Sequence, residues 1–333
     1  MLDPLLPTGG FAHSQGLESA AHSGLVKGGD DRLARRGETE FGWDAETFAR
    51  ECVASAASQS VPFVEAARRV FFSLRGNELT KKTDGGTTDG GTTDGDHVVT
   101  RAYAYSVAEA TEAFVALDRR LAARLVGNAV AARASAATGA ALLRAALVAF
   151  GKPKERNDSS SSVDDSYDSS YDSSSFFSAG LTEALARAKG STRSEKERGT
   201  RLPGAHLAVA FGAIAGAAGF SARHAARMFC YLTLRDTLSA ATRLNLLGPL
   251  AAGAAMRRCA ASANACAVEA VDACVRAAER EEASFAKGSS ERHASRRERA
   301  VLLAMTSRAA SSAPLVDIVH AGHDALFSRL FNS

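Results

Sequence analysis

The residues of this chain best suited to chemistry lie in one short stretch, LLPTGGFAHSQGLE, at residues 5–18. It holds a glycine pair, Gly9 and Gly10, followed by a histidine, a serine and a carboxylate. A glycine pair before a helix can cradle a phosphate with backbone N–H groups. The stretch lacks the GK[ST] sequence of a P-loop, and no strand pattern precedes it. The match is weak, but it leaves open a helical enzyme that binds an anionic ligand at this turn.

A nucleophile in the same stretch would pair Ser14 with His13 or His22. Ser14 is not in a GxSxG elbow, and the sequence identifies no third group for a triad. The alternative is structural: the glycines form a turn, Phe11 fills the core, and Ser14 caps a helix. Glu18 then lies near the positive end of that helix.

A metal site is the second kind of chemistry to consider. His320 and His323 are three apart on an expected helix, a spacing that can bring two imidazoles to one ion. Two ligands alone make a poor site, so we expect no metal bound by this chain itself. The cysteines are scattered without a CxxC pair, which argues against a zinc knuckle or a disulfide framework: Cys52, Cys230, Cys259, Cys266 and Cys274.

The composition limits the classes of partner that this chain can bind. Forty basic residues against 37 acidic ones give a formal charge of +3, too balanced for the basic field of nucleic-acid binding. No signal peptide pattern is visible, and the most membrane-like stretch, 205–220, is too short to span a bilayer. We expect a buried helix there, in which Gly212 and Gly216 let a neighbour approach, and a cytoplasmic protein that binds no membrane.

The elements that must position these residues are helices. Asp44 can cap a helix to Gln59, Pro62 suits a first turn, and SVAE at 106–109 is a capping box for a helix to Arg124. Further helices are expected at 128–150, 203–218, 221–245 and 249–284, with two shorter ones after them. The sequence predicts an all-α fold of about nine or ten helices in one domain spanning 1–333.

Three polar runs interrupt these helices, at about 77–96, 157–200 and 286–299. The first carries the repeat TDGGTTDGGTTDGD, which has no apolar side chain. The second joins an acidic, serine-rich half to a basic half. Such segments cannot bury enough apolar surface to offset the entropy of ordering, so we expect flexible insertions on a helical core.

The last residues, HDALFSRLFNS, contain Leu326, Phe327, Leu330 and Phe331 at helical spacings. Chain ends normally fray, so four large apolar residues on one side of a short helix need a surface to cover them. That surface is either the body of this protein or a groove on a partner. Arg329 would lie at the edge of the stripe, free to pair with a partner carboxylate.

Longer stretches show a family resemblance. LLPTGGFAHSQGLESAAHSGLV resembles the N-terminal signature of the urease accessory protein UreF family. LDRRLAARLVGNAVAARASAATGAALLR is similar to the family's middle helices, with Arg133, Ser135 and Gly139 at matching places. HLAVAFGAIAGAAGFSARHAARMFCYLTLRDTLSAATRLNLLGP and SAPLVDIVHAGHDALFSRLFNS are similar to its central and C-terminal parts. Together they cover about two thirds of the chain, although family members usually have a few more residues before the first turn.

The resemblance implies a non-catalytic, all-helical and usually dimeric protein. It would bridge the accessory protein UreD, also called UreH, and the GTPase UreG on the way to the urease apoprotein. Nickel and GTP would belong to the wider complex, with no cofactor bound by this chain itself.

The resemblance also implies where partners bind. The opening motif lies at the family's partner-binding end, Arg243 matches the family's arginine, and His323 matches its histidine near DI. Whether Arg243 caps a helix or contacts a partner stays open. The expected partner-binding residues are Pro7, Gly9, Gly10, Phe11, Ser14, Gly16, Glu18, Arg243, Asp317, His323, Leu326, Phe327, Arg329, Leu330 and Phe331.

Overall fold

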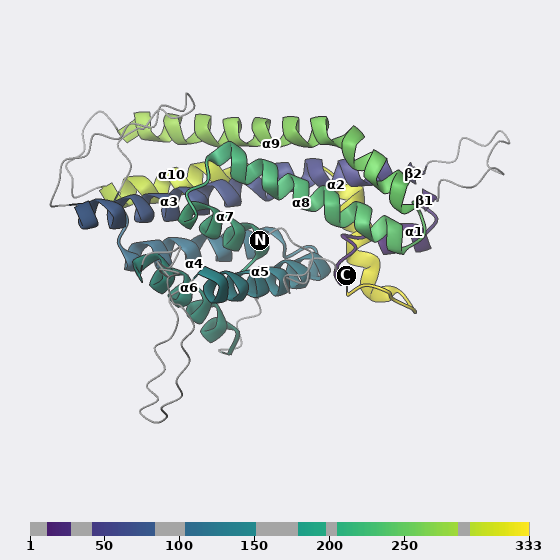
Figure 1. Ribbon diagram of the computed structural model, residues 1–333, viewed down its shortest axis with the longest axis horizontal. Helices are drawn as coiled ribbons and strands as arrows, with labels where there is room; N and C mark the ends of the chain where they lie inside the picture. The colour runs from purple at the N-terminus through teal and green to yellow at the C-terminus, as the bar shows by residue number, and fades with distance from the viewer. Residues whose placement is uncertain are drawn as a thin grey trace, which may run out of the picture.

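The computed structural model describes residues 12–27, 42–83, 104–150, 179–197, 205–285 and 294–332. These residues form eleven α-helices, a two-stranded parallel pair and a closing 3₁₀ turn, which confirms the all-α fold. Figure 1 shows them as an elongated bundle with α9 along one edge. The elements are α1 Leu17–His22, β1 Val26–Lys27, β2 Trp43–Asp44, α2 Ala45–Gln59, α3 Val61–Thr83, α4 Val107–Arg124, α5 Ala129–Phe150, α6 Ala179–Glu197, α7 Leu207–Ala217, α8 Ala222–Arg243, α9 Pro249–Phe285, α10 Ala294–Ser307, α11 Pro314–Ala321 and η3 Gly322–Ala325.

Two helix starts that the sequence predicts are confirmed in atomic detail. The Asp44 side chain accepts a hydrogen bond from the Thr47 N–H at 2.6 Å at the start of α2. At the start of α4, Ser106 and Glu109 form the expected capping box. Because these caps need only neighbouring residues, local sequence was enough to find them.

Helix α7 lies in the main core: its residues 208–217 are all buried, and its first residue, Leu207, is half-buried. A Cβ at Gly212 would lie 2.2 Å from the Val64 carbonyl oxygen, and one at Gly216 would lie 2.3 Å from that of Arg68. Both contacts are far closer than atoms tolerate. The two glycines therefore allow α7 to lie directly on α3, as the sequence predicts.

Buried polar groups fix the start of α7. The Asp118 carboxylate on α4 accepts hydrogen bonds from the N–H groups of Ala205 and His206 at 2.8 and 2.7 Å. The Ser135 hydroxyl on α5 accepts one from Leu207 N–H at 3.1 Å. These side chains satisfy the N–H groups of the N-cap His206 and of Leu207, which the helix leaves without partners, and that of Ala205 just before them. The helix begins at Leu207, four residues later than the expected start at 203.

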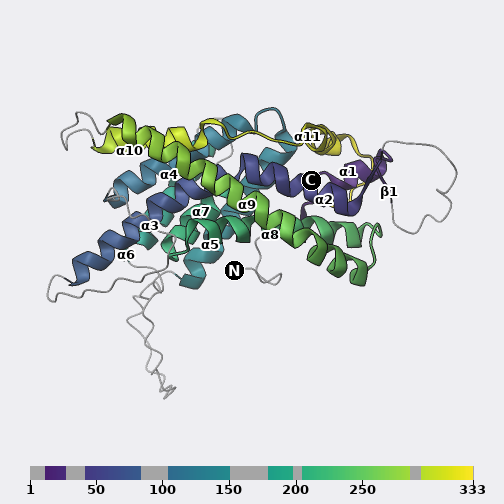
Figure 2. The same cartoon turned by 90° about the horizontal axis from the view of Figure 1, so that it is seen from above.

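A second, smaller core lies at one end of the bundle. Figures 1 and 2 both place α1, α11 and the C-terminal residues there, beside the ends of α2 and α8. Its buried members are Leu17, Ala20, Val26, Ala45, Phe48, Cys52, Ala240, Ala241, Ala313, Val316, Val319 and Phe331. The two ends of the described chain thus share one hydrophobic cluster.

The expected insertions need correction where the structure describes them. Helix α3 continues to Thr83 and α10 begins at Ala294, so residues 77–83 and 294–299 are helical. The larger error is α6, which occupies 179–197 inside the second run. Its buried face packs into the main core through Leu181, Ala184, Leu185 and Ala188. The polar residues around this face obscured its helical spacing. The remainder of each run lies outside the described residues.

The expected C-terminal helix is also wrong. After η3 the backbone becomes extended at Leu326, and residues 326–332 form bends rather than a helix. Asn332 N–H donates to the Ala12 carbonyl at 2.8 Å. The four apolar residues therefore do not share one face.

In the described part of the chain, α5 is long and apolar enough to cross a membrane by length and composition alone. The same helix packs against α7 and α6, and its residues Leu142, Leu143 and Ala146 are buried in the main core. Since core helices of folded proteins pass the same test, the packing favours a core helix.

Candidate functional site

The Glu18 carboxylate is the centre of the candidate site. It accepts hydrogen bonds from the N–H groups of Leu330 and Phe331, the latter at 3.1 Å, and from His323 Nε2 at 2.9 Å. Both Glu18 and His323 are almost completely buried. We call Glu18, His323 and the residues 330–331 that Glu18 holds the tail clamp. It attaches the last described residues to α1.

The electrostatics of the clamp favour an ionised Glu18. Burial acts to raise the pKa of Glu18, but the hydrogen bonds from Leu330, His323 and Phe331 outweigh it and hold the pKa below its ordinary value. Glu18 also lies in the first turn of α1, as expected. A buried negative charge at that position disfavours an anionic ligand there, and so weakens the alternative of an anion-binding enzyme.

Gly16 allows α1 to approach α11. It is the N-cap residue of α1 with φ of +87°, and a Cβ would lie 2.9 Å from both Cα and Cβ of His320. Only glycine meets both the backbone conformation and the space. Ser14, the expected cap, lies two residues before the N-cap position, although its hydroxyl does accept a hydrogen bond from the Glu18 N–H in the first turn, at 3.4 Å. The cap assignment is therefore corrected to Gly16.

Phe331 faces inward rather than toward a partner. Its side chain is buried in the small core, and the Arg243 guanidinium lies over its ring, 4.3 Å from the centroid. Arg243 is in the last turn of α8, where a cation is favourable, and this cation–π contact ties α8 to the tail. Phe331 is thus removed from the expected docking stripe.

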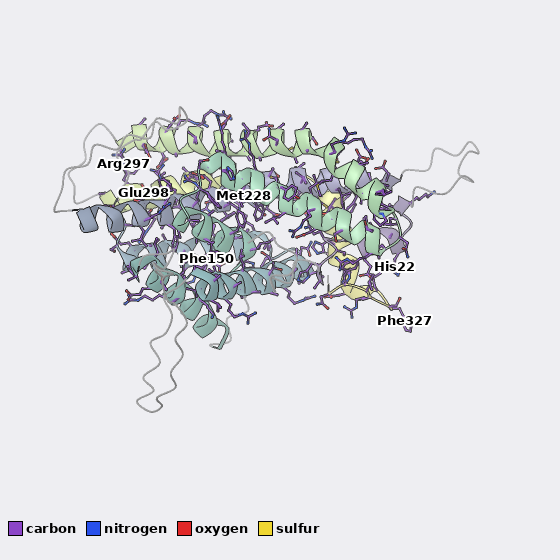
Figure 3. The ribbon with its side chains drawn as sticks, in the orientation of Figure 1. His22, Phe150, Met228, Arg297, Glu298 and Phe327 are labelled. Carbon is purple, nitrogen blue, oxygen red and sulfur yellow. The ribbon has the colours of Figure 1, made fainter. Side chains whose placement is uncertain are left out.

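The other tail residues face solvent. Phe327 is completely exposed and Leu330 is 62% exposed, while Leu326 is half-buried. Figure 3 shows Phe327 projecting away from the body of the protein. Arg329 is exposed and lies 3.5 Å from the Asp324 carboxylate, so this expected partner-facing arginine already has a nearby carboxylate. Phe327, close to the clamp, and Leu330, whose backbone belongs to it, remain as uncovered apolar side chains.

Two contacts that the sequence did not predict hold α11 and η3 in place. Arg133 on α5 pairs with Asp324 at 2.6 Å. Asn128 donates to the backbone carbonyl of Asp317 at 3.1 Å, and its side-chain oxygen accepts from Ala131 N–H. The resemblance matched Arg133 to the family, but its distant carboxylate partner gave no sequence signal.

A cavity of about 190 Å³ lies next to the clamp, and residues of α2, α4, α5, α7, α8 and α11 line it. Asp317, His13, His320 and Asp236 are among its lining residues. Burial raises the pKa of Asp236, although Arg235 and Arg243 oppose this. Burial, with the nearby charges of His323 and His13, lowers the pKa of His320 to about 4. His320 is therefore neutral at pH 7.

The described residues contain no group of three or more His, Cys, Asp or Glu side chains placed to hold a metal ion. His323 uses Nε2 on Glu18, and His320 Nε2 is buried without a hydrogen-bond partner in the described ranges. The expected site residues Pro7, Gly9, Gly10 and Phe11 lie outside the described residues, and with them the proposed turn.

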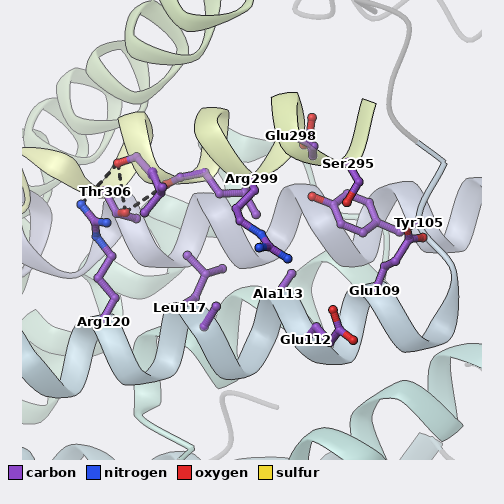
Figure 4. A pocket seen from close by; sticks show the side chains of 13 residues that line it. Tyr105, Glu109, Glu112, Ala113, Leu117, Arg120, Ser295, Glu298, Arg299 and Thr306 are labelled. Carbon is purple, nitrogen blue, oxygen red and sulfur yellow. Dashed lines mark hydrogen bonds between the residues drawn. The ribbon is translucent and has the colours of Figure 1, made fainter. Parts of the chain in front are cut away.

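A separate pocket of about 310 Å³ lies between α4 and α10. Figure 4 shows Arg299 reaching from α10 toward α4, with Leu117 below it and Glu112 farther along. Arg120 donates to the Leu303 carbonyl at 3.4 Å. The pocket brings together carboxylates and guanidinium groups without a nucleophile–base pair, so its residues do not suggest catalysis.

Comparison with known proteins assigns this sequence to a family. A family model described as UreF matches residues 96–260, from before α4 into α9. The chain belongs to the UreF family. The tail clamp lies outside the matched range, but a relative from Arabidopsis thaliana, named urease accessory protein F, aligns with the whole chain.

The relatives differ substantially in sequence from this UreF-family chain. The Arabidopsis protein is 26% identical over 338 aligned positions, which cover 90% of its length. A protein of the same name from Oryza sativa subsp. indica is 28% identical over 252 residues, 76% of this chain. Urease accessory protein 6 of Cryptococcus neoformans is 24% identical over 264 residues, 75% of this chain and 71% of the relative. The chain spans 64% of the length of the rice relative. These names describe accessory proteins, so the family is one of accessory proteins rather than enzymes.

Proposed function

We propose that this chain is a non-catalytic accessory subunit in urease maturation. It bridges a UreD/UreH-like protein and a UreG-like GTPase and delivers them to the urease apoprotein. Membership of the UreF family supports this role, and so do the names of the relatives. Nickel and GTP then act in the assembled complex, with nickel inserted into urease and GTP hydrolysed by the UreG-like protein. The proposal includes a homodimer in the cytoplasm.

The single structural observation that carries the docking part is the exposed pair of apolar side chains at the tail clamp, Phe327 and Leu330. Phe327 and Leu330 are held in an uncovered position because the backbone of Leu330 is fixed to Glu18. Holding apolar side chains ready in this way reduces the entropy lost on binding. We therefore propose that this end of the bundle, formed by α1, α11 and residues 326–330, docks the UreD/UreH-like protein.

The role as a bridge is tested by reconstitution. Purified urease apoprotein, UreD/UreH-like protein and UreG-like GTPase from the same organism are mixed with nickel and GTP, with and without this chain. We expect urease activity and a complex containing both accessory proteins only when this chain is present. Sedimentation of the chain alone reports the homodimer. Equal activation without the chain would contradict the bridging role.

The alternative of an anion-binding enzyme has its own test. It predicts saturable binding of inorganic phosphate or a nucleotide to the purified chain, which calorimetry can measure. We expect no such binding, because the Glu18 carboxylate occupies the start of α1. Turnover that survives purification and changes on substitution in residues 5–18 would favour the enzyme.

A further inference from the structure

A groove of about 630 Å³ is lined by residues of α2, the start of α3, α9, α10 and the segment that follows α10. In Figure 1, α9 runs along the edge of the molecule with α2 and α10 beneath it. Along α9 the groove extends from Cys266 to Arg280, about 21 Å at 1.5 Å per residue. It is therefore long enough to hold about four turns of another helix.

The groove stays open because its walls carry small side chains. Alanines from all three helices line it, together with Cys266 and Cys274 from α9. Met305 is the one large apolar side chain from α10 among its lining residues. Protein interiors normally fill such space to close packing. The walls therefore offer room for larger apolar side chains that this chain does not supply.

The charges at the groove are unbalanced. Arg276, Arg280 and Arg308 line it and are exposed, whereas Glu269 is its one lining carboxylate. None of the three arginines forms an ion pair within the described part of the chain; Arg280 donates to the Arg276 carbonyl. Elsewhere arginines on the same helix do pair, as Arg258 does with Glu46. The three guanidinium groups are thus available for carboxylates from outside.

We propose that this groove docks an acidic amphipathic helix of a partner protein. The apolar face of that helix fills the alanine-lined floor, and flanking Asp or Glu residues pair with Arg276, Arg280 and Arg308. Guanidinium groups bind carboxylates through two parallel hydrogen bonds, which set the orientation of the bound helix in addition to attracting it. The inference rests on the proposed accessory role, because it identifies a second partner-binding surface, separate from the tail clamp.

The test uses the full chain and three purified probes from the same organism: the UreD/UreH-like protein, the UreG-like GTPase and the urease apoprotein. One groove variant combines Arg276→Glu, Arg280→Glu and Arg308→Glu. Its matched control combines Arg144→Glu, Arg227→Glu and Arg257→Glu, three exposed arginines outside the groove with the same change in net charge. A second groove variant, Ala273→Trp, fills the space without changing charge.

We expect both groove variants to raise the dissociation constant of one probe at least tenfold. The control variant should keep that dissociation constant within twofold of the parent's. Cys266 gives an independent readout, because it is half-buried in the groove while the other four cysteines are buried. The bound probe should slow alkylation of Cys266 by N-ethylmaleimide several-fold. Unchanged binding of all three probes, or equal weakening by the control, would overturn the inference.

A change in the oligomeric state of the groove variants would also overturn it, because the occupant would then be a second copy of this chain. Failure of this inference is distinguishable from failure of the proposed function. If Phe327→Ala with Leu330→Ala abolishes capture of the UreD/UreH-like protein while groove variants bind all probes normally, only the groove assignment fails. If the reconstitution shows no dependence on this chain, the accessory role itself fails.

Discussion

Glu18 Oε2 and His323 Nε2 lie 2.9 Å apart, although 305 positions separate the two residues in the chain. The contact joins the first described helix to the last turn of the protein, and the same carboxylate holds the N–H groups of Leu330 and Phe331. The position of the exposed tail residues is therefore a consequence of one buried side chain.

Replacing that carboxylate should destabilise the protein. Glu18→Gln removes a charged acceptor and leaves buried donors without full partners, which costs about 1–3 kcal/mol for each unsatisfied group. We expect a loss of about 3 kcal/mol in urea unfolding at pH 7. Glu46→Gln is the matched control, since Glu46 pairs with Arg50 and Arg258 near the surface, and should cost less than about 1 kcal/mol. Equal effects would refute the central role of Glu18.

Acid should weaken the fold through two groups. The pKa of Glu18 is lowered in the folded state, so its stabilising contribution is complete above its ordinary value of 4.5 and is lost as pH falls through the folded value. The pKa of His320 is lowered to about 4 from 6.5, so the unfolded chain takes up a proton first and stability falls from pH 6.5 to 4.

The His320 contribution can be isolated by substitution. At about 1.4 kcal/mol per unit of pKa, it amounts to at most about 3.5 kcal/mol across that window. His320→Leu removes the titration and a buried Nε2 that lacks a hydrogen-bond partner in the described ranges. Urea unfolding at pH 7, 6, 5 and 4 should show a flatter dependence for this variant. A parent and variant with parallel pH profiles would exclude His320 as the cause.

Residues 326–332 should contain side chains that stabilise the fold and side chains that do not. Phe331→Ala should cost about 3 kcal/mol, because it empties part of the small core and removes the ring beneath Arg243. Truncation after Asp324 should cost more, since it also removes both backbone donors to Glu18. Phe327→Ala should leave the thermal midpoint unchanged, because that side chain is completely exposed. A stable truncated protein would show that the tail is dispensable for folding.

Much of the fold was predictable because its signals are local. Asp44 and Ser106 cap helices through residues three positions away, and glycine spacing at 212 and 216 indicated a close helix contact. The tail clamp was not predictable in the same way. Glu18 gives no local sign that it accepts backbone hydrogen bonds from 330 and 331, so the tail was expected to continue as a helix.

Helix α6 was missed for a different reason. Leu181, Ala184, Leu185 and Ala188 follow the i, i+3, i+4, i+7 spacing of a buried helix face, and that signal was present in the sequence. It was outweighed by the charged residues that follow it. The sequence therefore held the information for α6, within a run whose composition is otherwise polar.

The corrected boundaries of α6 give a sharp deletion test. Replacing residues 157–178 with a Gly-Ser linker should leave the thermal midpoint near that of the parent, because this run is polar and rich in serine and aspartate. Extending the replacement to residue 200 removes buried Leu181 and Leu185, each worth about 2–4 kcal/mol. We expect the longer replacement to lower the midpoint strongly. Similar midpoints for both would contradict the packing of α6.

The contact between α3 and α7 can be tested with one added methyl group. Gly212→Ala should cost about 2 kcal/mol, because the new Cβ would lie 2.2 Å from the Val64 carbonyl oxygen. Gly253→Ala in α9 is the control, since nothing lies within 4 Å of its added Cβ. Alanine's higher helix propensity should stabilise that variant by about 0.5–1 kcal/mol. Chemical unfolding should show that the two substitutions change the free energy of unfolding in opposite directions. A change in the same direction would contradict the close approach of α7 to α3.

The central claim is that the clamped tail presents Phe327 and Leu330 to the UreD/UreH-like protein. The most direct measurement is the dissociation constant of that purified protein for the parent chain and for the double variant Phe327→Ala, Leu330→Ala. Leu250→Ala, at an exposed leucine on α9, is the control. We predict at least a tenfold rise in the dissociation constant for the double variant, with no change in thermal midpoint and no effect of the control. An unchanged dissociation constant for the double variant would contradict the claim.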